Sequence, residues 1–296
     1  MINKIFTIHT LSPVHCGIGQ GLNDIDLPTA RNSISGHPII PASSIKGVLK
    51  EAFLNKETGC QNEIESLFGS DSGDFASAVS IGDANLLALP VRSFYGTFAY
   101  LVSPYTLMQL KTLFKRIGST DILPAIPEVG LEENNYKVFL TENSLLKGNN
   151  NLVLFEEMDL LAVQNNRLAD EWADIIASLY FNDDEGKEIF KKRFAIIDDN
   201  ALNFCCESGL PVDARIAIDV ETGTVKDGAL WYEETIPPET LFVGIIGIDR
   251  SYNKNNKATD IELKDFLTKS DEIYFQVGGK YTTGKGFVSL KFNERT

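Results

Sequence analysis

The sequence is poor in the residues on which several common kinds of site depend. It has 296 residues but only four cysteines and three histidines. The cysteines (Cys16, Cys60, Cys205 and Cys206) form no C-x-x-C pair and lie near no histidine cluster, which argues against a zinc site. Because Cys205 and Cys206 are adjacent in a chain of this length, we expect reduced, partly buried thiols rather than a disulfide framework.

Long apolar runs are also missing. No stretch approaches the roughly 20 apolar residues that span a bilayer. Residues 1–12 contain one lysine and no continuous apolar run, so they do not read as a secretory signal. The overall composition is that of an ordinary globular protein. We therefore expect a cytoplasmic protein without a membrane partner, built as one large domain or two smaller ones.

Positive charge is scarce, since the formal net charge is −14. Proteins that bind nucleic acid on their own usually present a basic surface, so the balance argues against a free-standing binder of that kind. A narrow basic groove is compatible with it. Binding depends on the local field, and an acidic remainder suppresses non-specific contact with RNA.

Periodic patterns predict strands and helices at both ends of the chain. A strand is expected at 2–11, with Phe6 and Ile8 on one face and Ile5 and Leu11 on the other. The other expected strands are 77–92 with a turn near Gly82-Asp83, 241–248, 272–277 and 286–292. The expected helices are 44–56, capped by Ser43 or Ser44, 105–117 and 260–268. This β–α–β … β–α–β order is typical of a ferredoxin-like or RNA-recognition-motif (RRM) sheet with helices on one face.

Three segments interrupt that order. The 12–38 loop is rich in Gly, Asn, Asp and Pro, and a loop this long is usually functional or disordered. Residues 128–210 are charged and Asn-rich, with helix-like runs at 167–181 and 184–194. Residues 211–235 read as a hairpin with its turn at 221–224. We predict an α+β protein with an RRM-like palm (1–127 and 236–296), an inserted helical subdomain (128–210) and a projecting β-hairpin thumb (211–235).

Two segments have the features of anion sites. Ser43, Ser44 and Lys46 stand at the start of a helix, where free N–H groups attract a phosphate, although a plain serine cap explains them equally simply. The loop 278–286 (Gly-Gly-Lys-Tyr-Thr-Thr-Gly-Lys-Gly) combines glycines that aim N–H groups at one anion with Lys280 and Lys285. A glycine-rich turn between two strands is the alternative, and the spacing is not that of a Walker loop.

Two further segments have the features of a cleavage site for RNA. The 12–38 loop contains His15, Asp24, Asp26 and Arg31, and RNA cleavage needs a group that activates the 2′-OH or holds a metal ion. The alternatives are a turn-forming aspartate and a structural histidine. Trp231, Tyr232 and Glu233 end the hairpin, where aromatics either wedge between bases or pack across the strands.

Several short motifs follow one another along the chain, and the first is Leu11-Ser12-Pro13-Val14-His15-Cys16-Gly17-Ile18-Gly19. It resembles the T-P-L-H-x-G-x-G opening of the RAMP superfamily of CRISPR proteins. Further blocks follow in the family's order: Asp26-Leu27-Pro28, residues 38–47, Leu67-Phe68-Gly69, Gly82-Asp83-Ala84, Pro90-Val91-Arg92-Ser93, residues 230–234 and Gly278-Gly279-Lys280. The terminal glycine signature is Gly284-Lys285-Gly286, with a lysine where arginine is frequent, so bidentate phosphate geometry is lost. The combination resembles the repeating backbone subunits of type III-B (Cmr) effector complexes and is weakest at 130–210.

The resemblance implies a function and a set of residue roles. Copies of the chain would form a filament on a guide CRISPR RNA, together with other type III effector subunits, and cut a complementary single-stranded target RNA at regular intervals. Guide phosphates would be held by Ser43, Ser44, Lys46, Arg92, Gly279, Lys280, Thr282 and Lys285. The thumb, with Trp231, Tyr232 and Glu233, would displace a base. Asp26 would promote cleavage with a divalent metal ion (Mg²⁺ or Mn²⁺) that it binds, assisted by His15.

Other functions remain open at this level. The chain could be a guide-RNA scaffold without nuclease activity, although Asp26 stands at the motif position. A guide-processing endoribonuclease of the same superfamily would use a histidine base, for which His9, His15 and His37 are available. A sugar or nucleotide enzyme is not supported, because the sequence has no paired acid and base and no Rossmann or Walker fingerprint.

Overall fold

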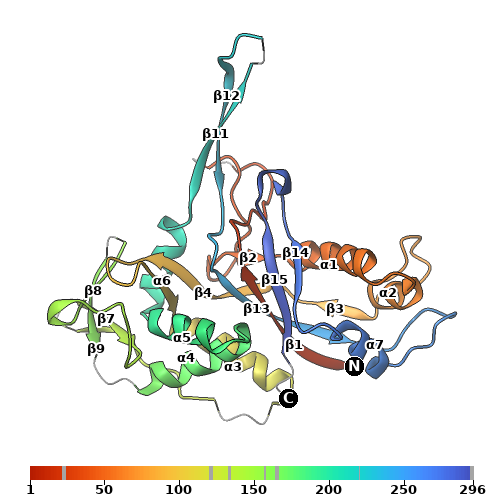
Figure 1. Ribbon diagram of the computed structural model, residues 1–296, viewed down its shortest axis with the longest axis horizontal. Coiled ribbons are helices and arrows are strands. Elements are labelled where there is room, and N and C mark those ends of the chain that lie inside the picture. Colours follow the sequence, from red (N-terminus) through yellow and green to blue (C-terminus); the bar gives the residue numbers. More distant parts are fainter. Residues whose placement is uncertain are drawn as a thin grey trace.

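The structure is a computed structural model that describes residues 1–21, 25–119, 123–132, 135–156, 158–163, 167–219 and 221–293. It is an α+β protein in which one large sheet is flanked by helices and a separate hairpin projects from the body (Figure 1). The first part of the chain forms β1 (Ile2–Thr10), β2 (Ile39–Ile40), α1 (Ala42–Lys56), α2 (Gln61–Phe68), β3 (Val79–Ile81), β4 (Ala84–Arg92), β5 (Phe98–Val102) and α3 (Pro104–Arg116).

The middle and the end of the chain supply the remaining elements. The middle forms β6 (Leu131–Glu132), β7 (Asn135–Leu140), β8 (Leu152–Phe155), β9 (Met158–Val163), α4 (Arg167–Tyr180), α5 (Asp184–Arg193), β10 (Phe194–Ile196) and α6 (Asp199–Ser208). The end forms β11 (Val212–Ile218), β12 (Val225–Glu234), β13 (Leu241–Ile248), α7 (Asp260–Leu267), β14 (Ile273–Gln276) and β15 (Phe287–Asn293). Two short 3-10 turns, Asn149–Asn151 and Tyr281–Thr283, complete the described part.

The strands of the body form a single sheet. In the described residues it has 13 strands, and its main path runs β14-β15-β1-β13-β4-β5-β10-β7-β9-β8. β1 lies antiparallel between β13 and β15, so that Phe6 faces Gly244 on one side and Phe292 on the other. The first strand of the chain is therefore held in place by strands made more than 200 residues later.

The segment 128–210 was predicted to be helical, and this is wrong in part. Its helices α4 and α5 lie where the sequence indicates them, but the same segment also supplies β7 to β10. β10 pairs in parallel with β5, and β7, β9 and β8 continue the sheet outward from β10. These strands have three to six residues each, which is too short to show a clear alternation.

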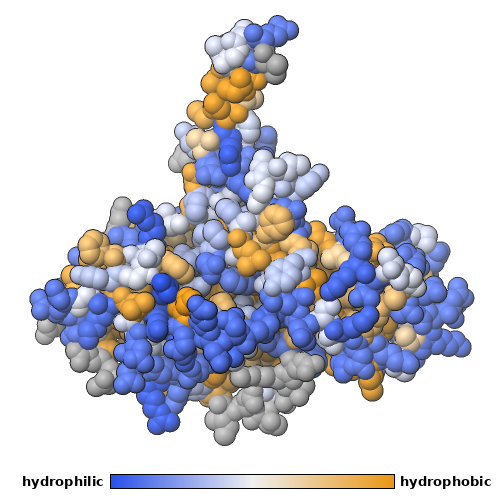
Figure 2. Space-filling view, viewed as in Figure 1, coloured by the Kyte–Doolittle hydropathy of each residue, from blue (hydrophilic) through white to orange (hydrophobic). Residues whose placement is uncertain are grey.

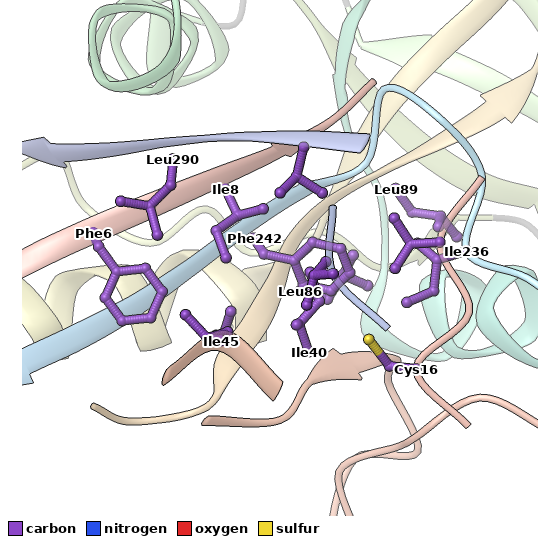
Figure 3. Close-up of a cluster of buried hydrophobic side chains, with 14 of the residues drawn as sticks. Phe6, Ile8, Cys16, Ile40, Ile45, Leu86, Leu89, Ile236, Phe242 and Leu290 are labelled. Carbon is purple, nitrogen blue, oxygen red and sulfur yellow. The ribbon is translucent and has the colours of Figure 1, made fainter. Parts of the chain in front are cut away.

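Alternate side chains of β1 enter two separate cores, one on each face of the sheet. Phe6 and Ile8 pack with Ile45 of α1 on the first face, and Figure 3 shows them with Leu290 above that helix. Ile5 points to the opposite face, where Leu107 of α3 and Trp172 of α4 are buried. The alternation predicted for Phe6, Ile8 and Ile5 is confirmed. Two expectations were wrong: Leu11 lies beyond the strand and is 44% exposed, and helices cover both faces rather than one.

The predicted hairpin is confirmed and projects from the body as the thumb (Figure 1). β11 and β12 are antiparallel, from Val212 opposite Glu234 to Ile218 opposite Val225, with an irregularity between Ile216 and Ile218. Both faces of this ribbon are accessible beyond its base, so apolar side chains stay exposed along it (Figure 2): Ile216, Ile218, Val225 and Leu230. Among the described helices, none has the length and apolar character needed to cross a membrane.

Candidate functional site

Backbone hydrogen bonds join the 12–38 loop to the base of the thumb. Val14 and Ile236 exchange two backbone hydrogen bonds of 2.9 and 2.8 Å. Gly17 pairs with Thr29, and Leu27 pairs in parallel with Glu233 of β12. The described part of the loop thus follows a course set by β12 and by the turn into β13.

His15 is buried at the centre of this junction, with 6% of its surface exposed. Its Nδ1 lies 2.8 Å from the carbonyl oxygen of Glu234, and because a carbonyl only accepts, Nδ1 carries the proton. A Cβ at Gly17 would lie 2.6 Å from Nε2, so the chain passes directly over the ring. These contacts hold the loop in place, and they leave His15 without an open path to a substrate atom in this conformation.

Asp26 lies at the surface, where the loop meets the thumb. Its Oδ2 accepts a hydrogen bond of 2.8 Å from the backbone N–H of Tyr232. Leu27 N donates to Tyr232 O at 3.0 Å, and Glu234 N donates to Leu27 O at 3.0 Å. Asp26 is therefore fixed beside the predicted thumb residues, although 206 positions separate it from Tyr232. Asp24, which the sequence also indicates, lies outside the described residues.

Glu233 is the buried centre of an ion-pair cluster, with 2% of its surface exposed. Oε1 accepts from Lys280 Nζ and from Trp231 Nε1, both at 2.7 Å. Oε2 lies 3.5 Å from Arg215 Nε and 3.6 Å from Lys285 Nζ. Burial opposes ionisation of this carboxyl, but the hydrogen bonds from Lys280 and Trp231 and the charges of Lys280 and Lys285 outweigh it and hold its pKa at about 2. The cluster joins the thumb to the 278–286 loop.

The 278–286 loop takes the left-handed conformations that its glycines allow. A Cβ on Gly278, whose φ is +82°, would lie 2.3 Å from the carbonyl oxygen of His15. Gly279 N and Gly286 N donate, each at 2.8 Å, to the carbonyls of His15 and Pro13. Thr282 is exposed, whereas the Lys285 side chain is only 6% exposed and lies between Asp213 and Glu233. The expectation that Lys285 offers its charge to a phosphate needs correction, because the thumb base covers it.

The start of α1 differs from its prediction. The helix begins at Ala42, and neither Ser43 nor Ser44 caps it. Asp83, which lies between β3 and β4, accepts the Ala42 N–H at 2.8 Å and so brings a carboxylate to the helix terminus. Ser43 is exposed, and Ser44 and Lys46 are half-buried. Burial, and then the charge of Lys50, lower the pKa of Lys46.

The structure brings most of the sequence-predicted residues together, but not all of them. His15, Asp26, Gly279, Lys280, Lys285, Trp231, Tyr232 and Glu233 are joined by the contacts described above. Arg92 is exposed at the end of β4, where its backbone pairs with Glu156. Within the described residues, no hydrogen bond or ion pair connects Arg92, Ser43, Ser44 or Lys46 to this cluster.

Sequence reasoning missed the roles of Glu234 and Thr29. Glu234 is 2% exposed and accepts from Thr29 N at 2.9 Å, Thr29 Oγ1 at 2.7 Å and Arg31 Nη2 at 2.5 Å. A signal was available, because Glu233 and Glu234 are adjacent in a strand, where neighbouring side chains point to opposite faces. Buried glutamates are almost always paired, so basic or donor partners were to be expected for one of the two.

The described residues do not by themselves build a metal cage. No group of three or more His, Cys, Asp or Glu side chains in this part of the chain is placed to hold an ion. Asp26 offers one carboxylate. That suits Mg²⁺ only if water and substrate phosphate complete its shell, which is a common arrangement for this ion.

Comparisons with known proteins match the chain over nearly its whole length. The family model described as the RAMP superfamily matches residues 7–289. The CRISPR system Cmr endoribonuclease Cmr4 of Pyrococcus furiosus is 33% identical, over 98% of this chain and 95% of its own. The crystal structure of oligomeric Cmr4 from the same organism superposes with a TM-score of 0.77 at 28% identity, covering 100% of both chains.

A more distant structure shares the fold. It is a chain of the type III-B Cmr-beta complex bound to cognate target RNA, with a TM-score of 0.72 at 21% identity, covering 99% of this chain and 97% of that one. With a family model that spans nearly the whole chain and a relative above 30% identity, the conclusion is direct: the chain belongs to the RAMP superfamily.

Proposed function

We propose that the chain is the repeating RNA-binding backbone subunit of a type III-B CRISPR effector complex and that it cleaves the bound target RNA. The observation that carries this proposal is the placement of Asp26, which is exposed and is held at the base of the thumb by Tyr232 N at 2.8 Å. The P. furiosus relative, which is named an endoribonuclease and whose structure is described as oligomeric, supports both parts. Copies of the chain, a guide RNA and other effector subunits are its partners.

The division of the chain follows from this role. The order β1-α1-β4-β13-α7-β15 supports a ferredoxin-like palm, in which β15, β1, β13 and β4 are neighbours in the sheet. The palm comprises residues 1–127 and 236–296, with 128–210 as the insert and 211–235 as the thumb. A base displaced by the thumb leaves its phosphate exposed next to Asp26.

Guide phosphates are held by a narrow track rather than by a basic surface. Lys280 is 36% exposed, and Gly279 and Thr282 lie next to it in the exposed turn. Lys46, near the start of α1, has no acidic partner among the described residues, and Arg92 presents a second exposed cation. Because the whole chain is strongly acidic, a single copy binds RNA weakly and a filament supplies the remaining affinity.

Cleavage proceeds by attack of the target 2′-oxygen on its own phosphorus, with departure of the 5′-oxygen. Tyr232 N engages Oδ2 of Asp26, so Oδ1 is the atom that accepts the 2′-OH proton or orients a hydrated ion. Asp26 would hold a divalent ion through its carboxylate, and the ion would supply positive charge against the charge that develops on the phosphate oxygens. The leaving oxygen takes a proton from solvent, and the 5′ fragment keeps a cyclic phosphate rather than a free 3′-OH.

The geometry favours this reading over guide processing by a histidine base. His15 and His37 are 6% and 4% exposed, and His9 Nε2 is bonded to Glu239 at 3.0 Å. A general base must come within hydrogen-bond distance of the proton it removes, and these three rings face protein groups instead. In a scaffold without nuclease activity, Asp26 would serve only to tie the loop to β12 through Tyr232 N.

The test is target-RNA cleavage by the assembled complex, with wild-type chain against Asp26→Ala and with target binding measured in parallel. We expect cleavage to fall by more than about a hundredfold while binding is kept, because Asp26 faces the solvent and contributes little to the fold. Asp265→Ala, which removes a carboxylate that is 63% exposed on α7, is the control. Cleavage that persists in Asp26→Ala, or a 5′ fragment with a free 3′-OH, contradicts the mechanism.

A further inference from the structure

The segment that carries Asp26 pairs with β12 in parallel through an isolated bridge, between Leu27 and Glu233. Two backbone hydrogen bonds of 3.0 Å join Leu27 to Tyr232 and Glu234, and the Asp26 carboxylate adds one more to β12. These bonds are few, and Asp26 itself is exposed, so in the described part of the chain the segment has little else to keep it from opening locally. A surface segment that must place a carboxylate accurately needs a firmer anchor close by.

Glu234 has the features of that anchor. Its carboxylate is buried and accepts three hydrogen bonds, two from Thr29 and one from Arg31, which makes both residues part of one charge-assisted network. Arg31 extends the network to α6 through Cys206 O at 2.9 Å and closes its own turn through Gly36 O at 3.0 Å. The carbonyl of Glu234 also holds His15. One residue at the end of β12 thus fixes the loop on both sides of Asp26.

We propose that Glu234 is the positioning residue for Asp26. The inference rests on the proposed function, in which Asp26 acts on the target RNA. Glu234 is buried and does not reach the substrate, so it acts through Thr29, three residues after Asp26. Because Glu234 belongs to the thumb strand, the catalytic loop and the hairpin move as one unit. The cut is therefore placed at a constant step from the base that the thumb displaces.

The test removes one donor of the network in the assembled complex. Thr29→Val deletes the hydroxyl that donates to Glu234 at 2.7 Å but keeps the backbone N–H and the shape of the side chain. We expect the single-turnover cleavage rate of bound target to fall by about tenfold to a hundredfold, the range for a lost hydrogen bond to a charged group, with target affinity kept within about twofold. Thr29→Ser retains the hydroxyl and is expected to recover most of the rate.

The control is Thr240→Val, which removes another buried hydroxyl, donated to Pro237 O at 2.7 Å, without touching the loop. Amide hydrogen exchange adds a second readout: in Thr29→Val the Leu27 amide is expected to exchange faster, while β13 keeps its protection. If the Thr29→Val complex cleaves at the wild-type rate while the separate Asp26→Ala complex is inactive, the positioning role alone is overturned. An equal loss of rate and affinity in Thr29→Val and Thr240→Val also overturns it, in favour of general destabilisation. An active Asp26→Ala complex removes the proposed function, and the inference with it.

Discussion

The Glu233 cluster makes a quantitative prediction about how firmly the thumb is attached. Glu233→Gln keeps the size of the side chain but removes the charge on which Lys280, Lys285 and Arg215 converge. The folded protein holds the pKa of Glu233 at about 2, against 4.5 for an ordinary glutamate. A depression of that size corresponds to up to about 3 kcal/mol of stabilisation at neutral pH.

The dependence on pH has a definite sign. Because the folded pKa is lower than the unfolded one, the stabilisation is fully present above pH 4.5 and is lost as the pH falls through 2. We therefore expect Glu233→Gln to unfold with a free energy about 3 kcal/mol smaller than wild type at pH 7. By pH 3 the difference should shrink to about half, since the wild type has then lost part of its advantage.

Urea unfolding at the two pH values measures this effect, with tryptophan fluorescence as the signal. Trp231 donates to Glu233 and reports on the cluster, so the comparison is best made in a Trp172→Phe background that silences the other tryptophan. Glu221→Gln, an exposed glutamate in the turn of the same hairpin, is the matched control and should leave the unfolding curve unchanged. A loss below about 1 kcal/mol at pH 7, or the same loss at both pH values, would refute the reasoning.

Two further predictions concern the neighbouring backbone. Gly278→Ala places a Cβ 2.3 Å from the His15 carbonyl oxygen, whereas Gly284→Ala meets nothing within 4 Å at a similar positive φ. Both substitutions should lower the melting temperature, and Gly278→Ala should lower it more. Its clash should cost about 1–3 kcal/mol of unfolding free energy beyond the cost of placing alanine at a positive φ. Equal losses for the two substitutions would show that the clash is relieved. Asp83→Ala removes the group that accepts the Ala42 N–H and should lower the free energy of thermal unfolding by about 1 kcal/mol. Asp83→Asn keeps an acceptor and should lower it by less. Equal losses would mean that the charge of Asp83, rather than the hydrogen bond, matters.

Local patterns explain which parts of the fold were predictable. The apolar run at 241–248, the two strands of the hairpin and the apolar stripes of α1 and α3 each contain their own local signal, and the structure has them where the sequence indicates. The strands at 135–196 were missed because their pairing partners, rather than their own residues, make them strands. The cap of α1 was missed for a similar reason. It is provided by Asp83, which accepts a hydrogen bond from the Ala42 amide although it lies 41 positions later in the sequence.

The sequence predicted several members of the thumb junction but not their arrangement. The motifs identified Asp26, Lys280 and Glu233 as important residues, and the structure places them within one junction. Their contacts were not predictable, because each one joins segments that are distant in sequence and depends on the docking of the thumb. For Lys285 this changes the interpretation: read alone it is an exposed cation, but in the fold it is a buried partner of Glu233 and Asp213.

The long sequence separations at this junction have a consequence for biosynthesis. Thr29 precedes its partner Glu234 by 205 residues, and Asp26 precedes Tyr232 by 206. β1 pairs with β13 and with the final strand β15. Because a ribosome synthesises the chain from its N-terminus, the 12–38 loop emerges long before its partner residues have been made. Such non-local contacts also close slowly. A nascent chain that ends before residue 232 lacks Tyr232, Glu234 and the lysines of the 278–286 loop, so in the proposed function the site is complete only when nearly the whole chain has been made.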